Sequence, residues 1–194
     1  MACVKLSKRK SNIDGDGLFA DEFIKKGKII MVWLYKAKLI NEETYITEQE
    51  NGNKNMIITG ARGVGNIFLH TSDKPRYENY INHSENPNVL YHAGICYALC
   101  NIEKDTELTT NYTYLLSPKD KPVVDLVSGK KITGVSAMLC LKQTSKMLHD
   151  LMENINDEND LEPNILSPFC ESDILPDTHQ HSPRQQLQVT EIKN

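Results

Sequence analysis

A polar segment lies inside an apolar run and is the part of this sequence best suited to bind a ligand. It reads Asn82-His83-Ser84-Glu85-Asn86-Pro87-Asn88 and is flanked by Tyr80-Ile81 and Val89-Leu90. Turn formers and polar side chains of this kind concentrate in ligand-binding loops. An asparagine side chain is both donor and acceptor, so it can bind a polar ligand in either sense. The alternatives are a structural histidine or a glycosylation acceptor, and nothing in the sequence suggests the secretion that glycosylation needs.

A pair of glycines, Gly15 and Gly17, precedes the polar segment and encloses Asp16. Glycine lets the backbone approach a ligand closely and present its N–H groups. The segment is not a dinucleotide fingerprint, because a third glycine is missing and no strand–helix unit follows, and it lacks the Gly-Lys-Ser/Thr of a phosphate loop. Two glycines beside aspartates also form an ordinary turn, so the pair gains meaning only from the motifs around it.

A third element, Glu107-Leu108-Thr109-Thr110-Asn111-Tyr112, follows the polar segment after a β-like run. A lone tyrosine at the end of a strand is structural by default. In this order and spacing, however, the three elements resemble the signature of SET-domain protein lysine methyltransferases over roughly residues 4–114. The resemblance implies that S-adenosyl-L-methionine is bound by Gly15, Asp16, Gly17, Asn82, His83 and Tyr112, and that Tyr112 is the catalytic residue.

Methyl transfer to lysine suits these residue types. The displacement is in line, so catalysis is mostly positioning and placement of charge. The acceptor amine must be neutral although its free pKa is about 10.4, and an aromatic, desolvated channel beside a cation favours that form. Tyr112 is the candidate for the hydroxyl that orients the amine. Candidate channel walls are Tyr35, Tyr97 and Tyr114, for each of which a core or surface position is an equally good interpretation.

The sequence departs from the family pattern at several points. Asn111 replaces a frequent aspartate, Asn79 replaces a frequent arginine, and Ala37-Lys38 replaces a frequent Gly-Glu. No Cys-x-Cys zinc module follows Tyr112, so another segment must close the lysine channel. These departures favour, as the main alternative, a catalytically inactive SET-like module that binds a protein partner. A different nucleotide enzyme built on the two glycines is the third hypothesis.

The chain around these motifs predicts a β-rich α+β fold. Short strands broken by Gly, Asn and Asp occupy residues 4–113, and the resemblance adds a SET-domain fold of several small sheets with a pseudoknot. Strand-like stretches are Lys28–Ile40, Met56-Ile57-Ile58, Ile67-Phe68-Leu69 and a hairpin over 89–99 that turns at Ala93-Gly94.

The chain after Tyr112 changes character twice. We predict a SET domain over 1–116, then an extension over 117–155 with a hairpin at 123–132 and an amphipathic helix at 137–155 capped by Ser136. Residues 156–194 contain eight acidic and two basic side chains, which gives this segment a charge of −6 and leaves residues 1–155 at +2. This composition predicts a disordered acidic tail.

Composition limits the function classes. The net charge of −4 argues against general nucleic-acid binding. The chain shows no apolar run long enough for a transmembrane helix and no signal peptide, so we expect a soluble intracellular protein. Five scattered cysteines without a Cys-x-x-Cys predict reduced thiols and no metal site. The expected partner is a protein substrate carrying a lysine, histone or non-histone.

Overall fold

The computed structural model describes residues 1–32, 38–41, 61–64, 67–70 and 77–155, together with positions 43, 44, 47, 50 and 51. The predictions for Tyr35, for Met56-Ile57-Ile58 and for the acidic tail 156–194 lie outside these residues. The described strands and helices follow one another in chain order as β1 (Leu6–Lys10), β2 (Asp16–Ala20), β3 (Ile29–Val32), β4 (Lys38–Asn41), β5 (Ala61–Val64), β6 (Ile67–His70), η1 (Tyr77–Tyr80), β7 (Asn82–His83), β8 (Val89–His92), β9 (Ile95–Ala98), β10 (Glu107–Thr110), η2 (Tyr112–Tyr114), β11 (Val123–Val124), β12 (Lys131–Ile132) and α3 (Ala137–Glu153).

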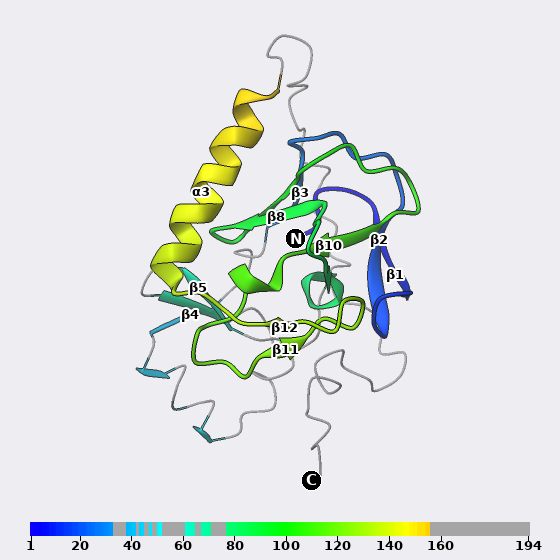
Figure 1. Cartoon of the computed structure of the whole chain (residues 1–194). Helices are drawn as coiled ribbons and strands as arrows, with labels where there is room; N and C mark the ends of the chain where they lie inside the picture. The colour runs from blue at the N-terminus through cyan, green and yellow to red at the C-terminus, as the bar shows by residue number, and fades with distance from the viewer. Residues whose placement is uncertain are drawn as a thin grey trace.

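The described strands form several small sheets, as the sequence predicts. Their orders are β1-β2-β10-β7, β3-β9-β8, β4-β6-β5 and β11-β12. Figure 1 shows these sheets as separate small units with α3 along one side. The hairpin predicted over 89–99 is confirmed as β8 and β9. Its two-residue turn has positive φ at Ala93 and Gly94, 47° and 89°, the combination of a type I′ turn that suits the twist of paired strands.

The first sheet brings the three sequence motifs together. Strand β10 pairs antiparallel with β2, where Leu108 faces Leu18, and parallel with β7, where Thr109 and Thr110 face Asn82 and His83. Parallel neighbours require a crossover connection, and the β8–β9 hairpin lies within it. The juxtaposition implied by the family resemblance is thus present, while the threading of the chain beneath a loop stays a prediction.

One hydrophobic core supports these sheets. Fully buried side chains come from the first sheet (Leu18, Leu108), from β3 (Ile30) and from the bridged pair Ile24 and Ile102. In β2 the buried residues Leu18 and Ala20 alternate with the partly exposed Phe19, which is the pattern of a strand buried on one face. The sheet that carries the functional motifs is therefore part of this packed core.

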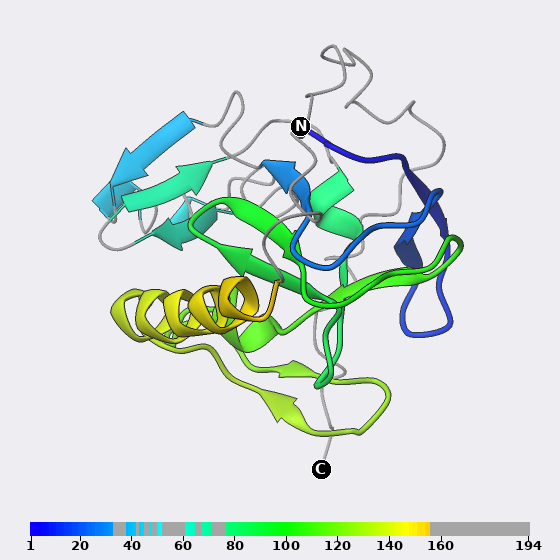
Figure 2. The ribbon, with the colours of Figure 1, turned by 90° about the horizontal axis from the view of Figure 1, so that it is seen from above.

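Helix α3 confirms the predicted amphipathic helix and its cap. The Ser136 side chain accepts a hydrogen bond from the Leu139 amide, and the helix ends at Glu153. Figures 1 and 2 both show α3 lying alongside β8. Thr144, which is fully buried, faces His92 of β8 at 2.8 Å. Cys140 donates from Sγ to the Tyr114 carbonyl at 3.2 Å, so α3 also contacts η2. None of the helices in the described ranges has the length and apolar character needed to cross a membrane.

We expect Thr144→Val to lower the free energy of unfolding by about 1–3 kcal/mol. The Thr144 hydroxyl donates to the Cys140 carbonyl at 2.8 Å, so His92 Nδ1 must be the donor of the bond between them. Valine keeps the volume but leaves that buried N–H without an acceptor. Urea unfolding measures this loss of stability. Thr144→Ser keeps the hydroxyl and should retain most of the stability. Equal losses for the valine and serine variants would contradict this account.

Candidate active site

Tyr112 is held from both ends by the segment that contains Asn82 and His83. Its backbone N–H donates to His83 Nδ1 at 3.1 Å, and its hydroxyl donates to the Ile81 carbonyl at 2.9 Å. The rings of His83 and Tyr112 lie 5.4 Å apart between centroids, tilted by 54°. Asn111 caps η2 by accepting the Thr113 N–H. The tyrosine predicted to be catalytic is therefore fixed in position beside the Asn-His pair.

The Asn82 side chain links the polar segment to the glycine loop. It is 5% exposed. Its amide nitrogen lies 3.0 Å from the Asp14 carbonyl and 2.8 Å from Glu107 Oε1, and 3.1 Å from Ser11 Oγ. A buried amide with several acceptors on different segments sets the distance between those segments. Asn82 thus positions the loop through its side chain, while its backbone belongs to the β7–β10 pairing.

A serine and a glutamate complete the loop. Ser11 Oγ donates to the Glu107 carboxylate at 2.8 Å and accepts the Ile13 N–H at 2.8 Å. A Cβ at Gly17 would stand 2.3 Å from Glu107 Oε1, so the loop depends on the absence of a side chain at that position. Gly15 has φ of 49°, a conformation that glycine adopts without cost. The two predicted glycines are needed for different reasons, one for space and one for conformation.

The two aspartates of the glycine loop differ in environment. Asp16 Oδ1 lies 2.8 Å from Lys10 Nζ, and Lys8 is near Oδ2 at 3.5 Å. The hydrogen bond from Lys10 and the lysine charges hold the Asp16 pKa below its ordinary value. The Asp16 carboxylate is therefore engaged by two lysines of β1, and its backbone pairs with Lys10 of the same strand. Partial burial raises the pKa of Asp14, a residue that sequence reasoning did not single out.

The environment of His83 favours its neutral form. Burial lowers its pKa, and the opposing charges of Asp125 and Glu85 only partly offset that effect. A neutral ring can keep Nδ1 unprotonated, which the bond from the Tyr112 N–H requires. The ionisation state of His83 is thereby coupled to the position of Tyr112.

This coupling predicts a loss of stability in acid. Because the His83 pKa lies below its unfolded value of about 6.5, the unfolded chain binds more protons between the two values, and the free energy of unfolding falls as pH drops below about 6.5. Burial lowers the pKa of His92 as well, which adds a slope of the same sign. Urea unfolding between about pH 5 and pH 7 should show a shallower slope for His83→Gln than for wild type. The control is His149→Gln on an exposed position of α3, and an unchanged slope in His83→Gln would refute the coupling.

The structure describes two of the three tyrosines that we predict to line the lysine channel. Tyr114 shares η2 with Tyr112 and is partly exposed, and its place in a channel wall stays a prediction. Tyr97 belongs to β9 in another sheet, where it faces Leu90, and burial followed by the nearby Cys96 raises its pKa. Tyr35 lies outside the described residues. Among the residues that the structure describes, no group of three or more His, Cys, Asp or Glu side chains is placed to hold a metal ion.

Comparison with known proteins agrees with this geometry. The SET domain family model matches residues 15–113. A proposed histone methyltransferase of Plasmodium falciparum is 27% identical, with a TM-score of 0.41 and coverage of 56% of this chain and 93% of that one. Two structures of the Chaetomium thermophilum Polycomb Repressive Complex 2 are each 20% identical to this chain, with TM-scores of 0.47 and 0.44. Each match covers 81% of this chain and 23% of the other chain. Among curated proteins, no sequence matches the chain.

The family match begins at Gly15 and ends one residue after Tyr112, so it contains all three motifs of the site. It covers more than half of the 194 residues. The strand pairing between β7 and β10, the tyrosine beside the Asn-His pair and this match lead to one conclusion. The chain belongs to the SET-domain family.

Proposed function

We propose that the protein is an S-adenosyl-L-methionine-dependent protein-lysine N-methyltransferase. Members of the SET-domain family are typically protein lysine methyltransferases. The observation that carries the proposal is the fixed position of Tyr112, with its backbone bonded to His83 and its hydroxyl to Ile81, on the sheet that also holds the glycine loop. The substrate is a protein with an accessible lysine, histone or non-histone.

The glycine loop and the Asn-His segment fit the proposed cofactor. Gly15, Asp16, Gly17, Asn82, His83 and Tyr112 would bind it, and the side chains of Asp16 and Asn82 are engaged within the protein. Bound S-adenosyl-L-methionine supplies a methyl group on a cationic sulfonium. A side chain at Gly17 would collide with the Glu107 carboxylate, so the backbone there must stay free of a side chain.

Tyr112 would orient the acceptor amine. Its hydroxyl hydrogen is committed to the Ile81 carbonyl, so the oxygen presents its lone pairs on the other side and can accept an N–H from a neutral lysine amine. Accepting that N–H directs the nitrogen lone pair away from the tyrosine and towards the reacting carbon. The lysine must first lose a proton, and exclusion of water by aromatic walls such as Tyr114 favours the neutral amine.

Isothermal calorimetry with S-adenosyl-L-methionine tests the cofactor assignment. We expect saturable binding that ATP and NAD do not reproduce, although both contain adenosine. Gly17→Ala should weaken it, because the added methyl group displaces the Glu107 carboxylate. Absence of binding at millimolar cofactor would instead favour the inactive protein-interaction module suggested by Asn79 and Ala37-Lys38. Binding of ATP or NAD in its place would favour a different nucleotide enzyme.

A further inference from the structure

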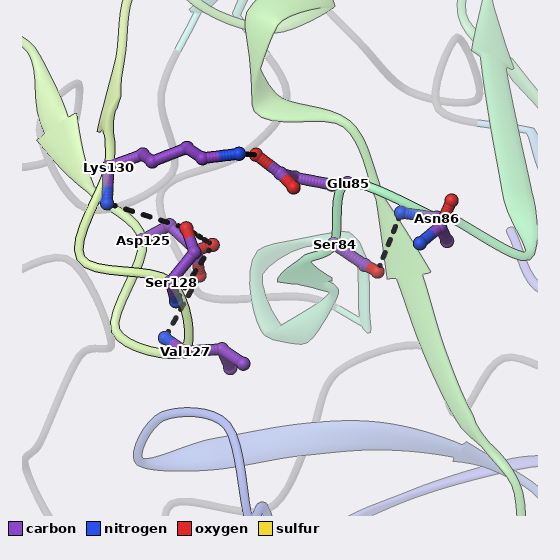
Figure 3. A network of polar contacts seen from close by, with 7 residues as sticks. All are labelled: Ser84, Glu85, Asn86, Asp125, Val127, Ser128 and Lys130. Atoms are coloured by element: carbon purple, nitrogen blue, oxygen red, sulfur yellow. Dashed lines mark hydrogen bonds and ion pairs between the residues drawn. The ribbon is translucent and has the colours of Figure 1, made fainter.

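The hairpin formed by β11 and β12 is a firmly built element. Val123 and Ile132 are buried at its base. Asp125 is 6% exposed, and its carboxylate accepts the N–H groups of Val127 and Ser128 at 3.1 and 3.2 Å and the Ser128 hydroxyl. Figure 3 shows this network folded inside the turn. The inner side of the hairpin, with Val123, Asp125 and Ile132, is therefore buried, and the residues between them form its exposed outer side.

The hairpin is attached to both segments that surround Tyr112. Lys130 Nζ lies 2.8 Å from Glu85 Oε1 in the polar segment, a pair that Figure 3 shows bridging the two. Val135, just after β12, donates its N–H to the Thr113 carbonyl at 3.3 Å. These two contacts place the hairpin beside the Asn-His pair, and the Asp125 charge accordingly acts to raise the His83 pKa against the effect of burial. The hairpin thus borders the proposed methyl-transfer site.

The outer side of the hairpin is apolar and basic. Three large aliphatic side chains are unusually exposed, Val124 at 48%, Leu126 at 62% and Val127 at 74%. Lys121 and Lys131 are exposed on the same segment, whereas Asp125, the one acidic residue between them, is buried. Exposed aliphatic side chains that lie together often mark a site of interaction with another molecule. Lys131 lies opposite Val124 in the β11–β12 pair, so positive charge borders this apolar group.

We propose that this outer hairpin surface, defined as Lys121, Val124, Leu126, Val127 and Lys131, binds the substrate polypeptide beside the acceptor lysine and selects aliphatic and acidic flanking residues over basic ones. The inference rests on the proposed function, since it assigns the substrate class of that site. Aliphatic residues of the substrate cover Leu126 and Val127, and its carboxylates meet the two lysines. Strongly basic segments, such as arginine- and lysine-rich tails, meet like charge at the same place.

Fluorescence anisotropy with the full chain tests this preference without requiring catalysis. The probes are lysine-centred peptides whose flanking residues are aliphatic and acidic, neutral and polar, or basic. We expect the first class to bind about tenfold more tightly than the basic class at low salt, with the difference shrinking as salt screens it. In the double variant Lys121→Glu with Lys131→Glu, the affinities for the aliphatic–acidic and basic peptides should lie within about twofold of each other. Leu126→Ser with Val127→Ser should weaken the aliphatic–acidic class about tenfold.

Two matched variants control for charge and apolar area elsewhere on the surface. Lys104→Glu reverses an exposed charge on another loop, and Met138→Ser removes a side chain that is 70% exposed on α3; both should keep the wild-type preference. Equal binding of the three peptide classes, or an unchanged preference in the hairpin variants, would overturn the proposal even if methyl transfer occurs. A dimer that the Leu126–Val127 variant dissociates would assign the surface to a second copy instead. Peptide preference without cofactor binding would refute the proposed function and leave the surface standing.

Discussion

Replacing Tyr112 by phenylalanine is expected to reduce methyl transfer by about 10²- to 10³-fold while cofactor binding changes little. The substitution removes one oxygen atom, and with it the acceptor that orients the lysine amine. The backbone bond from residue 112 to His83 remains, and the lost hydroxyl bond to Ile81 costs only about 1 kcal/mol of stability. The turnover number with radiolabelled cofactor and the calorimetric affinity, measured on the same preparation, separate the two effects.

Tyr91→Phe is the matched control for this prediction. It removes the same atom from a tyrosine in the β3-β9-β8 sheet that is not a candidate site residue, so it should retain most of the activity. An equal loss in both variants would show that the hydroxyl of Tyr112 has no special part in the transfer. Unchanged turnover in Tyr112→Phe would disprove the assigned role directly.

Replacing Asn82 by aspartate is expected to lower the free energy of unfolding by about 3 kcal/mol and to abolish measurable cofactor binding. The change is isosteric, but it puts a carboxylate where an amide donates. That carboxylate would lie about 2.8 Å from Glu107 Oε1 and 3.0 Å from the Asp14 carbonyl, both acceptors. The repulsion acts in a nearly buried place and separates the glycine loop from the polar segment. Urea unfolding and hydrogen exchange of residues 11–17 measure the two consequences.

A second substitution makes this prediction specific. Glu107→Gln in the Asn82→Asp background restores a donor opposite the new carboxylate, so the double variant should recover much of the lost stability. Asn86→Asp, an exposed change in the same loop, should have almost no effect on unfolding. If the double variant is no more stable than Asn82→Asp alone, the contact between residues 82 and 107 does not organise the loop.

Much of the fold follows from local patterns in the sequence. The turn at Ala93-Gly94, the hairpin around Ser128-Gly129 and the helix capped by Ser136 were all predictable, because each depends on residues close together in the chain. The parallel pairing of β7 with β10 was not, since each contributes only a short stretch and periodicity does not specify a distant partner. That pairing came from the family resemblance alone.

The site was predictable to the extent that its residues lie in recognisable motifs. The structure brings Asn82 to the loop that contains Gly15 and Gly17, and His83 to Tyr112, while the roles of these residues stay predictions. Ser11 was missed because a lone serine before a turn carries no pattern, and its role depends on the distant Glu107. Asp125 was missed because its effect on His83 arises only when the hairpin packs against the polar segment. Both are long-range contacts that spacing along the chain does not encode.

The most direct test of the account is the detection of methyl-lysine after incubation of the full chain with S-adenosyl-L-methionine and a panel of histones and cell lysate. We predict cofactor-derived methyl groups on lysine side chains of at least one protein, and their absence when Tyr112→Phe replaces the wild-type chain. A wild-type chain that binds the cofactor but labels no lysine, or labels it equally well without the Tyr112 hydroxyl, would contradict the account.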